Sequence, residues 1–273
     1  MTKLNLTKDI LIQDYNELKC LTKISIKYGV HRQTIANLFK KLNIEYKSKI
    51  HKYSSNEEYF NNDNQDVFYW AGFIAADGCM YQNKAGLQQL VIKLAEQDLS
   101  HLILFKHYIE TQAPISLYIN KNSLRNKKWN DTKQYQLRIT SKKIYESLKR
   151  FNIVSRKTKI YDFPDWLIEH PLVHHFMRGY FDGDGCISNS TNWYLSIRGN
   201  KNFLKKYKLI IEKQGNLESK VNITINNGTH QLMFGGRYII NVITNYLYKD
   251  STLCLQRKYE KHIMLCQENN NEN

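Results

Sequence analysis

Two stretches of this sequence are closely similar, and both end in Asp-Gly-Cys. Residues Trp70–Cys79 read WAGFIAADGC, and residues Met177–Cys186 read MRGYFDGDGC. The two copies are separated by about the length of a small domain. A single short match of this kind is common, but a matched pair is not. The repeat therefore predicts a chain built from two related halves, each containing one copy.

Each copy has small residues at a helical spacing. Gly72 and Ala76 are four positions apart, and so are Gly179 and Gly183. Residues four apart lie on one face of a helix, and small side chains let the backbone of a second helix approach closely. We therefore expect the two copies to form a pair of packed helices, with these four residues at the interface.

Two aspartates are expected at the ends of these helices. Gly78 and Gly185 follow them, and we expect each glycine to end its helix in the left-handed conformation. Asp77 and Asp184 would then lie in the last turn, where the helix dipole disfavours a negative charge. If the helices pack together, the two carboxylates converge and repel each other unless a cation lies between them. Mg²⁺, which binds one or two carboxylates together with substrate phosphate oxygens, fits such a site.

These paired stretches resemble the two motifs of the LAGLIDADG homing endonucleases in their single-chain form. The resemblance implies an α+β fold of two pseudo-symmetric αββαββα halves, with antiparallel sheets that form a saddle in the major groove of DNA. It assigns the metal-binding acids to Asp77 and Asp184. The sixth motif position is Ala75 in the first copy and Asp182 in the second. That position is not the principal metal ligand in the family.

Composition agrees with a nucleic-acid partner inside the cell. The net charge of +15 favours a polyanionic partner, and 42% hydrophobic residues suffice for real cores. No run of 18 apolar residues or apolar signal segment is present, so we expect no membrane association. Five scattered cysteines without a C-x-x-C pair indicate reduced thiols. We expect an intracellular protein, in the cytoplasm of a bacterial or phage-infected cell or in an organelle.

The N-terminal segment resembles a helix-turn-helix. A short helix is expected to end at Gly29, and residues 32–42 would form the recognition helix. Its outward face would present five polar or basic residues to DNA: Arg32, Gln33, Asn37, Lys40 and Lys41. The alternative is a helical hairpin without DNA contacts.

The whole chain divides into five predicted segments. Residues 1–45 form the helix-turn-helix-like unit, and the polar residues 46–66 form a linker. Residues 67–160 and 161–266 form the two repeats, and residues 267–273 form a polar tail.

Expected strands in both repeats alternate between apolar and polar residues, which gives each sheet one buried face and one polar face. Near residue 223, for example, Val221, Ile223 and Ile225 are expected on the buried face. The polar faces carry side chains that can bind base edges or phosphates. The candidates for DNA binding are Lys93, Gln136, Arg138, Tyr194, Ser196, Arg198, Asn222, Thr224, Asn226 and Gln231. The alternative is that these are ordinary solvated strand faces.

The function that these features predict is site-specific, metal-dependent cleavage of double-stranded DNA by a monomer, as in intron homing. Asp77 and Asp184 would bind Mg²⁺, for which Mn²⁺ can substitute. Lys157 and Lys258 each follow the last apolar segment of a half. By analogy with the basic residue of the family they are candidates for catalysis, and the alternative is that they contact phosphates or solvent.

Two other functions use the same fold. A LAGLIDADG-derived regulator would bind DNA without cleaving it, although the chain keeps both acids. An intron RNA maturase would use the basic surface without needing the aspartates. Binding to intron RNA without DNA cleavage would favour the maturase.

Overall fold

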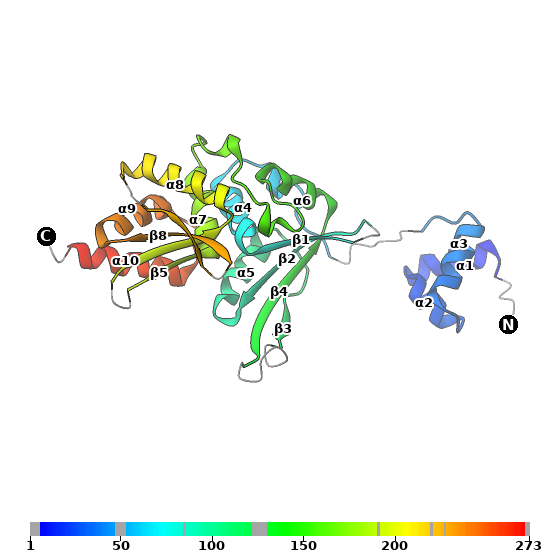
Figure 1. Ribbon diagram of the computed structural model, residues 1–273. Helices are drawn as coiled ribbons and strands as arrows, with labels where there is room; N and C mark the ends of the chain where they lie inside the picture. Colours follow the sequence, from blue (N-terminus) through cyan, green and yellow to red (C-terminus); the bar gives the residue numbers. More distant parts are fainter. Residues whose placement is uncertain are drawn as a thin grey trace. The chain divides into compact units, whose positions relative to one another are not determined.

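The computed structural model describes residues 6–46, 53–83, 86–121, 130–189, 192–218, 221–226 and 228–270. The chain forms two compact units, Met1–His51 and Lys52–Asn273, and each has its own hydrophobic core (Figure 1). Within the described ranges, no helix has the length and apolar character needed to cross a membrane.

The smaller unit consists of three short helices. They are α1 (Lys8–Leu18), α2 (Leu21–Lys27) and α3 (Arg32–Lys41). Gly29 has φ +63° in the turn between α2 and α3, a conformation that glycine adopts without steric cost. Ile24, Ile35 and Phe39 are fully buried in the small core between the helices. The expected position of the second helix of the turn therefore agrees with α3.

The larger unit contains two halves with the same order of elements. The first half comprises α4 (Gln65–Asp77), β1 (Gly78–Gln82), β2 (Gln88–Ala95), α5 (Leu99–Tyr108), β3 (Ser116–Asn120), β4 (Thr132–Thr140) and α6 (Lys142–Ser147). The second half comprises α7 (Val173–Asp184), β5 (Gly185–Ser188), β6 (Tyr194–Gly199), α8 (Lys201–Gly215), β7 (Ile223–Asn226), β8 (Thr229–Gly235) and α9 (Arg237–Tyr248). The predicted αββαββα organisation is confirmed, and a further helix, α10 (Gln256–Asn270), follows the second half.

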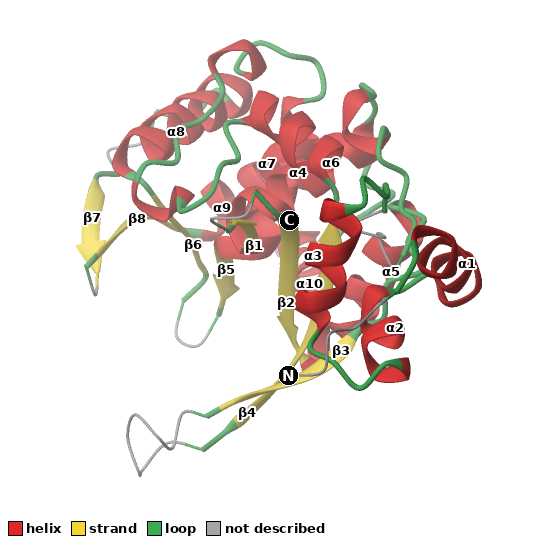
Figure 2. Ribbon diagram, turned by 90° about the vertical axis from the view of Figure 1, so that its right-hand side faces the viewer, coloured by secondary structure: helices red, strands yellow, loops and turns green. Residues whose placement is uncertain are grey.

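Each half contains one antiparallel sheet of four strands. The strand orders are β1-β2-β4-β3 and β5-β6-β8-β7, so the strand that directly follows each motif helix is at an edge of its sheet. Helices α5 and α6 pack on the first sheet, and α8 and α9 pack on the second. Within the larger unit, α4, α6, α7 and α8 lie on one side of the sheets in the view of Figure 2. The opposite face of each sheet carries exposed polar side chains, such as Lys93 and Arg138 in the first sheet and Arg198 in the second.

The two motif helices α4 and α7 lie side by side at the centre of the larger unit (Figures 1 and 2). Every residue from Val67 to Ala75 is buried in α4. A Cβ added to Gly72 would lie 2.0 Å from the carbonyl oxygen of Phe176 in α7. Only glycine permits so close an approach, because any side chain would overlap the backbone of the other helix.

Gly78 and Gly185 do not adopt the expected left-handed conformation. Their φ values are −77° and −91°, and each glycine is the first residue of a strand. A Cβ at Gly78 would lie 2.6 Å from Cγ2 of Ile74, and one at Gly185 would lie 2.2 Å from Cδ2 of Phe181. Close packing against the preceding helical turn, rather than a positive φ, therefore requires glycine at both positions.

The predicted linker 46–66 is also only partly a linker. Residues 47–52 of this range lie outside the described residues, whereas residues 53–66 belong to the larger unit. Tyr59 and Phe60 are buried in its main core, and the Asn64 side chain caps α4 by accepting a bond from the backbone N–H of Val67. Polar residues at the start of α4 therefore cap a helix instead of forming a linker.

The polar tail and one strand position also differ from expectation. Helix α10 continues to Asn270, and its Glu268 accepts a bond of 2.8 Å from Nε1 of Trp193; residues 271–273 of the predicted tail lie outside the described residues. Ile225 is 71% exposed, although alternation assigned it to the buried face. It lies on the edge strand β7, opposite His230.

Candidate active site

The first component of the site is the pair of aspartates at the ends of the motif helices. Asp77 is the last residue of α4, and Asp184 is the last residue of α7. The position of a Cβ on Gly183 is 3.5 Å from Oδ2 of Asp77, so this carboxylate lies against the final turn of the opposite helix. The two acids are therefore neighbours at one end of the helix pair.

Both carboxylates have raised pKa values. Burial and the negative charge of Asp184 raise the pKa of Asp77 to about 6. Burial likewise raises the pKa of Asp184. Part of the Asp77 side chain reaches solvent, so dense protein surroundings rather than complete exclusion of water cause this shift. Two such carboxylates at one place are unfavourable without a compensating positive charge.

Two buried lysines supply positive charge to this site. Lys157 donates a hydrogen bond of 3.4 Å to the carbonyl oxygen of Ala76, at the end of α4. The Lys258 Nζ donates to the carbonyl oxygens of the last turn of α7: those of Phe181 at 2.8 Å, Asp182 at 2.6 Å and Gly183 at 3.3 Å. Each lysine thus binds the negative end of one motif helix, where a positive charge is favourable.

Burial lowers the pKa of both lysines. The pKa of Lys258 falls to about 8, because its 3% exposed side chain is removed from water, while the charges of the nearby acids oppose this shift. Burial also lowers the pKa of Lys157, although the negative charge of Asp184 opposes this shift. The four residues therefore form one electrostatic cluster, although they come from distant parts of the chain.

The donor set of the cluster fits a magnesium ion. Among the described residues, no group of three or more His, Cys, Asp or Glu side chains is placed to hold a metal. Mg²⁺ does not need one, because it keeps several waters and binds one or two carboxylates together with substrate phosphates. Asp77 and Asp184, whose pKa values are raised by burial, are the residues that would hold it.

The polar sheet faces extend from this cluster on both sides. In the first sheet, Cys79 is opposite Val91, and Val91 is opposite Arg138. In the second sheet, Cys186 is opposite Ser196, and Ser196 is opposite Met233. Because β1 and β5 begin at Gly78 and Gly185, directly after Asp77 and Asp184, the two acids lie where both sheets start.

The predicted DNA-binding residues of the sheets differ in how accessible they are. Three of them are exposed on their strands: Lys93, Arg138 and Arg198. Gln136 and Tyr194 are half-buried on the same polar faces, and Asn222, Thr224 and Asn226 are exposed at or beside β7. Ser196 and Gln231 are only 6% and 5% exposed, and Gln231 accepts a bond from Asn226.

Neighbouring side chains hold two of these residues in place. The Arg138 Nη1 donates to Oε1 of Gln89 at 3.0 Å, and the Lys93 Nζ lies 3.9 Å from the centre of the Tyr118 ring. Gln89 itself was not predicted from the sequence, although its position opposite Thr140 follows the same alternation. Such contacts fix the direction of long side chains before a ligand arrives.

In the smaller unit, α3 presents the predicted recognition surface. Its polar and basic candidates are all exposed: Arg32, Gln33, Asn37, Lys40 and Lys41. The Gln33 amide donates to Oδ1 of Asn37 at 3.1 Å, so these two side chains lie side by side on one face.

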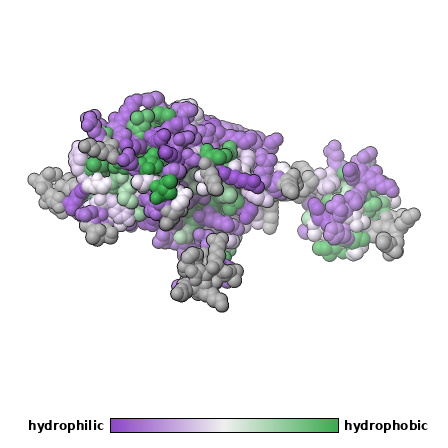
Figure 3. Space-filling view, viewed as in Figure 1, coloured by the Kyte–Doolittle hydropathy of each residue, from purple (hydrophilic) through white to green (hydrophobic). Residues whose placement is uncertain are grey.

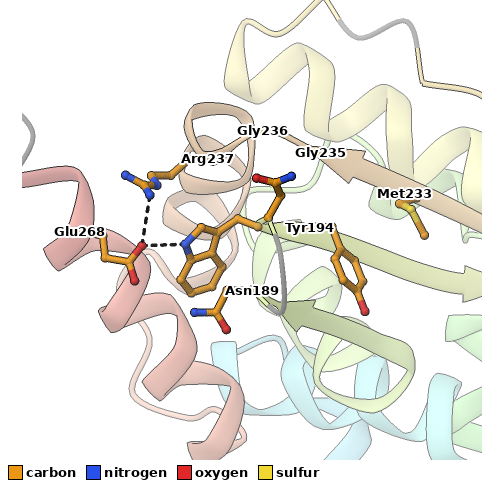
Figure 4. A pocket seen from close by; sticks show the side chains of 9 residues that line it. Asn189, Tyr194, Met233, Gly235, Gly236, Arg237 and Glu268 are labelled. Carbon is orange, nitrogen blue, oxygen red and sulfur yellow. Dashed lines mark hydrogen bonds and ion pairs between the residues drawn. The ribbon is translucent and has the colours of Figure 1, made fainter.

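A separate cavity of about 890 Å³ lies at the far end of the second sheet. Tyr194, Met233, Arg237 and Glu268 line it, and an ion pair links Arg237 to Glu268 (Figure 4). Its lining contains neither aspartate of the cluster. In the space-filling view of the larger unit, hydrophilic residues predominate and apolar patches are small and scattered (Figure 3). The cavity is therefore separate from the cluster at the helix ends.

The sequence analysis assigned no role to two buried charged residues, Arg178 and Asp182. They are 0% and 1% exposed, and both lie on α7. The first copy of the motif has alanines, Ala71 and Ala75, at these positions. The sequence did contain a signal for them, because charged residues occur at these positions in only one of the two copies.

Comparison with known proteins agrees with this fold. No protein-family model and no curated protein matches the sequence. The solved structure of the homing endonuclease I-WcaI bound to its DNA recognition sequence aligns with a TM-score of 0.52 and 15% identity, over 71% of this chain and 88% of that one. A double mutant of I-SmaMI aligns with a TM-score of 0.51 and 13% identity, over 77% and 93%.

Full-length WhiA from Thermatoga maritima aligns less closely, with a TM-score of 0.48 and 17% identity, over 78% of this chain and 65% of that one. The alignments with I-WcaI and with the I-SmaMI double mutant confirm the predicted LAGLIDADG fold. At these identities the likeness concerns the fold.

Proposed function

We propose that this chain of LAGLIDADG fold is a site-specific DNA endonuclease that depends on a divalent metal. The observation that carries the proposal is the pairing of Asp77 and Asp184 at the ends of two packed helices, where both polar sheet faces begin. A duplex bound along both faces would pass over the two carboxylates. Its scissile phosphates would then lie beside the residues suited to bind a metal.

Binding of duplex DNA would rest on the two polar faces and on the net charge of +15. Arg, Gln, Asn and Thr side chains can bind base edges in the major groove, and lysines can bind phosphates. The complex of I-WcaI with its recognition sequence has this fold, which supports the same mode of binding here. The two faces carry different side chains, so the target would be nearly asymmetric.

In the proposed reaction, Asp77 and Asp184 hold Mg²⁺, and Mn²⁺ can replace it. The bound ion supplies neutralisation of phosphate charge and a water of lowered pKa. The lysines add positive charge beside the carboxylates. Lys258 uses all three of its N–H donors on carbonyl oxygens, so its part is electrostatic. Lys157 makes one long bond among the described residues, which leaves donors for a phosphate oxygen or a water.

The test separates binding from cleavage. Duplexes that the protein retains from a randomised library supply a target, which is then incubated with protein and Mg²⁺. Asp77→Asn and Asp184→Asn should abolish cleavage, because they remove a metal-binding oxygen charge, and should leave binding within a few-fold. Undiminished double-strand cleavage by either variant would contradict the assignment.

The same experiment distinguishes the two other functions. Tight binding to a duplex without breaks would identify a DNA-binding regulator. Binding only to structured intron RNA would identify a maturase. Either result would refute the proposed endonuclease activity while leaving the fold unchanged.

A further inference from the structure

The two copies of the motif differ in a pair of residues that lies away from the acids. Arg178 and Asp182 are one helical turn apart on α7, and the first copy has Ala71 and Ala75 there. Burying two charged side chains is costly unless each is paired and hydrogen-bonded. Their complete burial in one half therefore calls for a reason specific to that half.

Arg178 binds the segment that joins α9 to α10. Its Nε donates to the carbonyl oxygen of Leu253 at 2.9 Å, and its Nη1 donates to that of Leu247 at 3.1 Å. The Nη2 lies 2.9 Å from Nδ1 of His175, which accepts a hydrogen bond from it. All of these partners are buried, so the guanidinium fixes both ends of the segment to α7.

Asp182 binds the same segment from the next turn of the helix. Its Oδ2 accepts bonds from the backbone N–H of Leu255 at 2.7 Å and from the Tyr69 hydroxyl at 2.8 Å. Its Oδ1 accepts a bond from the Tyr248 hydroxyl at 2.9 Å. Asp182 thus joins three elements: α4, the end of α9 and the start of α10.

The bond to Leu255 sets the position of Lys258. The Leu255 carbonyl oxygen accepts bonds from the N–H groups of Lys258 and Tyr259, so Leu255 begins the first turn of α10. The positive end of the α10 helix dipole also stabilises a carboxylate at this point. Lys258 follows within that turn, and its Nζ returns to the carbonyl oxygens at the end of α7.

We propose that Asp182, supported by Arg178, is a positioning residue that holds Lys258 beside Asp184. The inference rests on the proposed nuclease function, since it gives Lys258 a role in one half of the active site. Asp182 contacts neither substrate nor metal in this account. It acts through Leu255 and the first turn of α10.

The first half lacks this arrangement. Lys157 lies in a short 3₁₀ helix, Lys157–Lys159, and its bond to the carbonyl oxygen of Ala76 is 3.4 Å long. Ala75, the counterpart of Asp182, has no side-chain polar atom with which to fix that segment. Loss of Asp182 should therefore affect Lys258 and leave Lys157 in place.

Lysine acetylation mapped by mass spectrometry tests this without DNA or metal. In the wild-type protein, Lys258 should react slowly because it is buried and bonded. Asp182→Ala should raise its acetylation rate by about tenfold, the scale of a lost hydrogen bond to a charged group, with Lys157 unchanged. Asp182→Asn should restore most of the protection, because an amide can still accept from Leu255 and donate to Tyr248.

Matched tyrosine variants control for simple loss of stability. Tyr248→Phe removes one bond to Asp182 and should raise the Lys258 rate by a smaller factor. Tyr207→Phe removes an equally buried hydroxyl, which donates to the carbonyl oxygen of Met177 in α7. This variant should leave the acetylation rate of Lys258 unchanged. If Asp182→Ala does not fold, the comparison of these two tyrosine variants carries the test. Equal rates for them, or equal increases at Lys157 and Lys258, would overturn the inference.

Cleavage of a target labelled on each strand gives the functional outcome. Asp182→Ala should slow cleavage of one strand about tenfold relative to the other, so that nicked DNA accumulates. Lys258→Met should slow cleavage of the same strand. Equal slowing of both strands would overturn the positioning role. If the wild-type protein cuts neither strand, the proposed function fails, whereas the acetylation result still decides whether Asp182 positions Lys258.

Discussion

A Cβ on Gly179 would lie 1.9 Å from the carbonyl oxygen of Tyr69. These two residues belong to different halves of the chain, and the reciprocal contact joins Gly72 to Phe176. The two backbones therefore approach until only hydrogen atoms fit between them. Because the acids are the last residues of the same helices, this contact also sets how close Asp77 and Asp184 lie.

We expect Gly179→Ala to destabilise the larger unit by about 3 kcal/mol or more, the upper range for overpacking, because backbone cannot move aside as a side chain can. Chemical denaturation followed by circular dichroism would measure the free energy of unfolding. Gly235→Ala is the control, since a Cβ there meets no atom within 4 Å. Equal stability of both variants would show that the helices are not packed as described.

Replacing an acid should stabilise the protein at neutral pH. The folded-state pKa of Asp77, about 6, exceeds its ordinary value of 3.8, so the ionised group costs stability above pH 6 and nothing below pH 3.8. Asp77→Asn should therefore raise the free energy of unfolding at pH 7.5 by about 1 kcal/mol. This is less than the whole pKa shift of Asp77 implies, because solvent screens the charge of this exposed group.

The gain from Asp77→Asn should disappear as the pH falls towards 4, where the wild-type carboxyl is already protonated. Denaturation at pH 7.5 and at pH 4 would measure both values. The exposed Glu218→Gln serves as the control and should change stability little at either pH. A constant difference between wild type and Asp77→Asn across this range would contradict the proposed crowding of charge.

Mg²⁺ should stabilise the wild-type protein even without DNA. A ligand that binds only the folded state adds about 2.7 kcal/mol when its concentration is 100 times its Kd. Thermal denaturation should show a rise in Tm with millimolar Mg²⁺ that the Asp77→Asn/Asp184→Asn double variant lacks. A similar rise in Glu218→Gln and in the double variant would mean that the ion binds elsewhere.

The N-terminal unit should contribute contacts to DNA phosphates. Deleting residues 1–50 removes a unit with a separate core, so the larger unit should remain folded. Its affinity should fall, and the slope of log K against log salt should decrease by about 0.9 for each lost contact.

Point variants refine the test of the N-terminal unit. Lys40→Gln with Lys41→Gln on α3 should reduce the salt slope in the same direction, whereas Lys8→Gln on α1 should not. An unchanged slope after the deletion would show that this unit does not bind phosphates.

Much of this architecture could be predicted from local patterns. The small residues of the motifs predicted the helix pair, and alternation in β2 and β6 predicted their buried faces, because both signals lie within a few consecutive residues. The joint position of Asp77 and Asp184 followed from the repeat alone. Lys157 and Lys258 were singled out by position, and both are buried against the ends of the motif helices.

Other features depend on contacts between residues distant in sequence. Nothing near Asp182 indicates that Leu255, more than seventy residues later, donates to it. Glu268 reads as part of a polar tail until Trp193 is placed beside it. Ile225 fits the alternation of a buried strand, but it lies on an edge strand and is 71% exposed. Tertiary packing decides each of these cases.

The most direct test of the account is the sequence of the DNA ends after incubation of a bound target with protein and Mg²⁺. The account predicts one break in each strand at fixed, staggered positions, with short 3′ overhangs as the family resemblance implies. These breaks should be absent with Asp184→Asn and without a divalent metal. Tight binding of intact DNA by the wild-type protein under the same conditions would contradict the account.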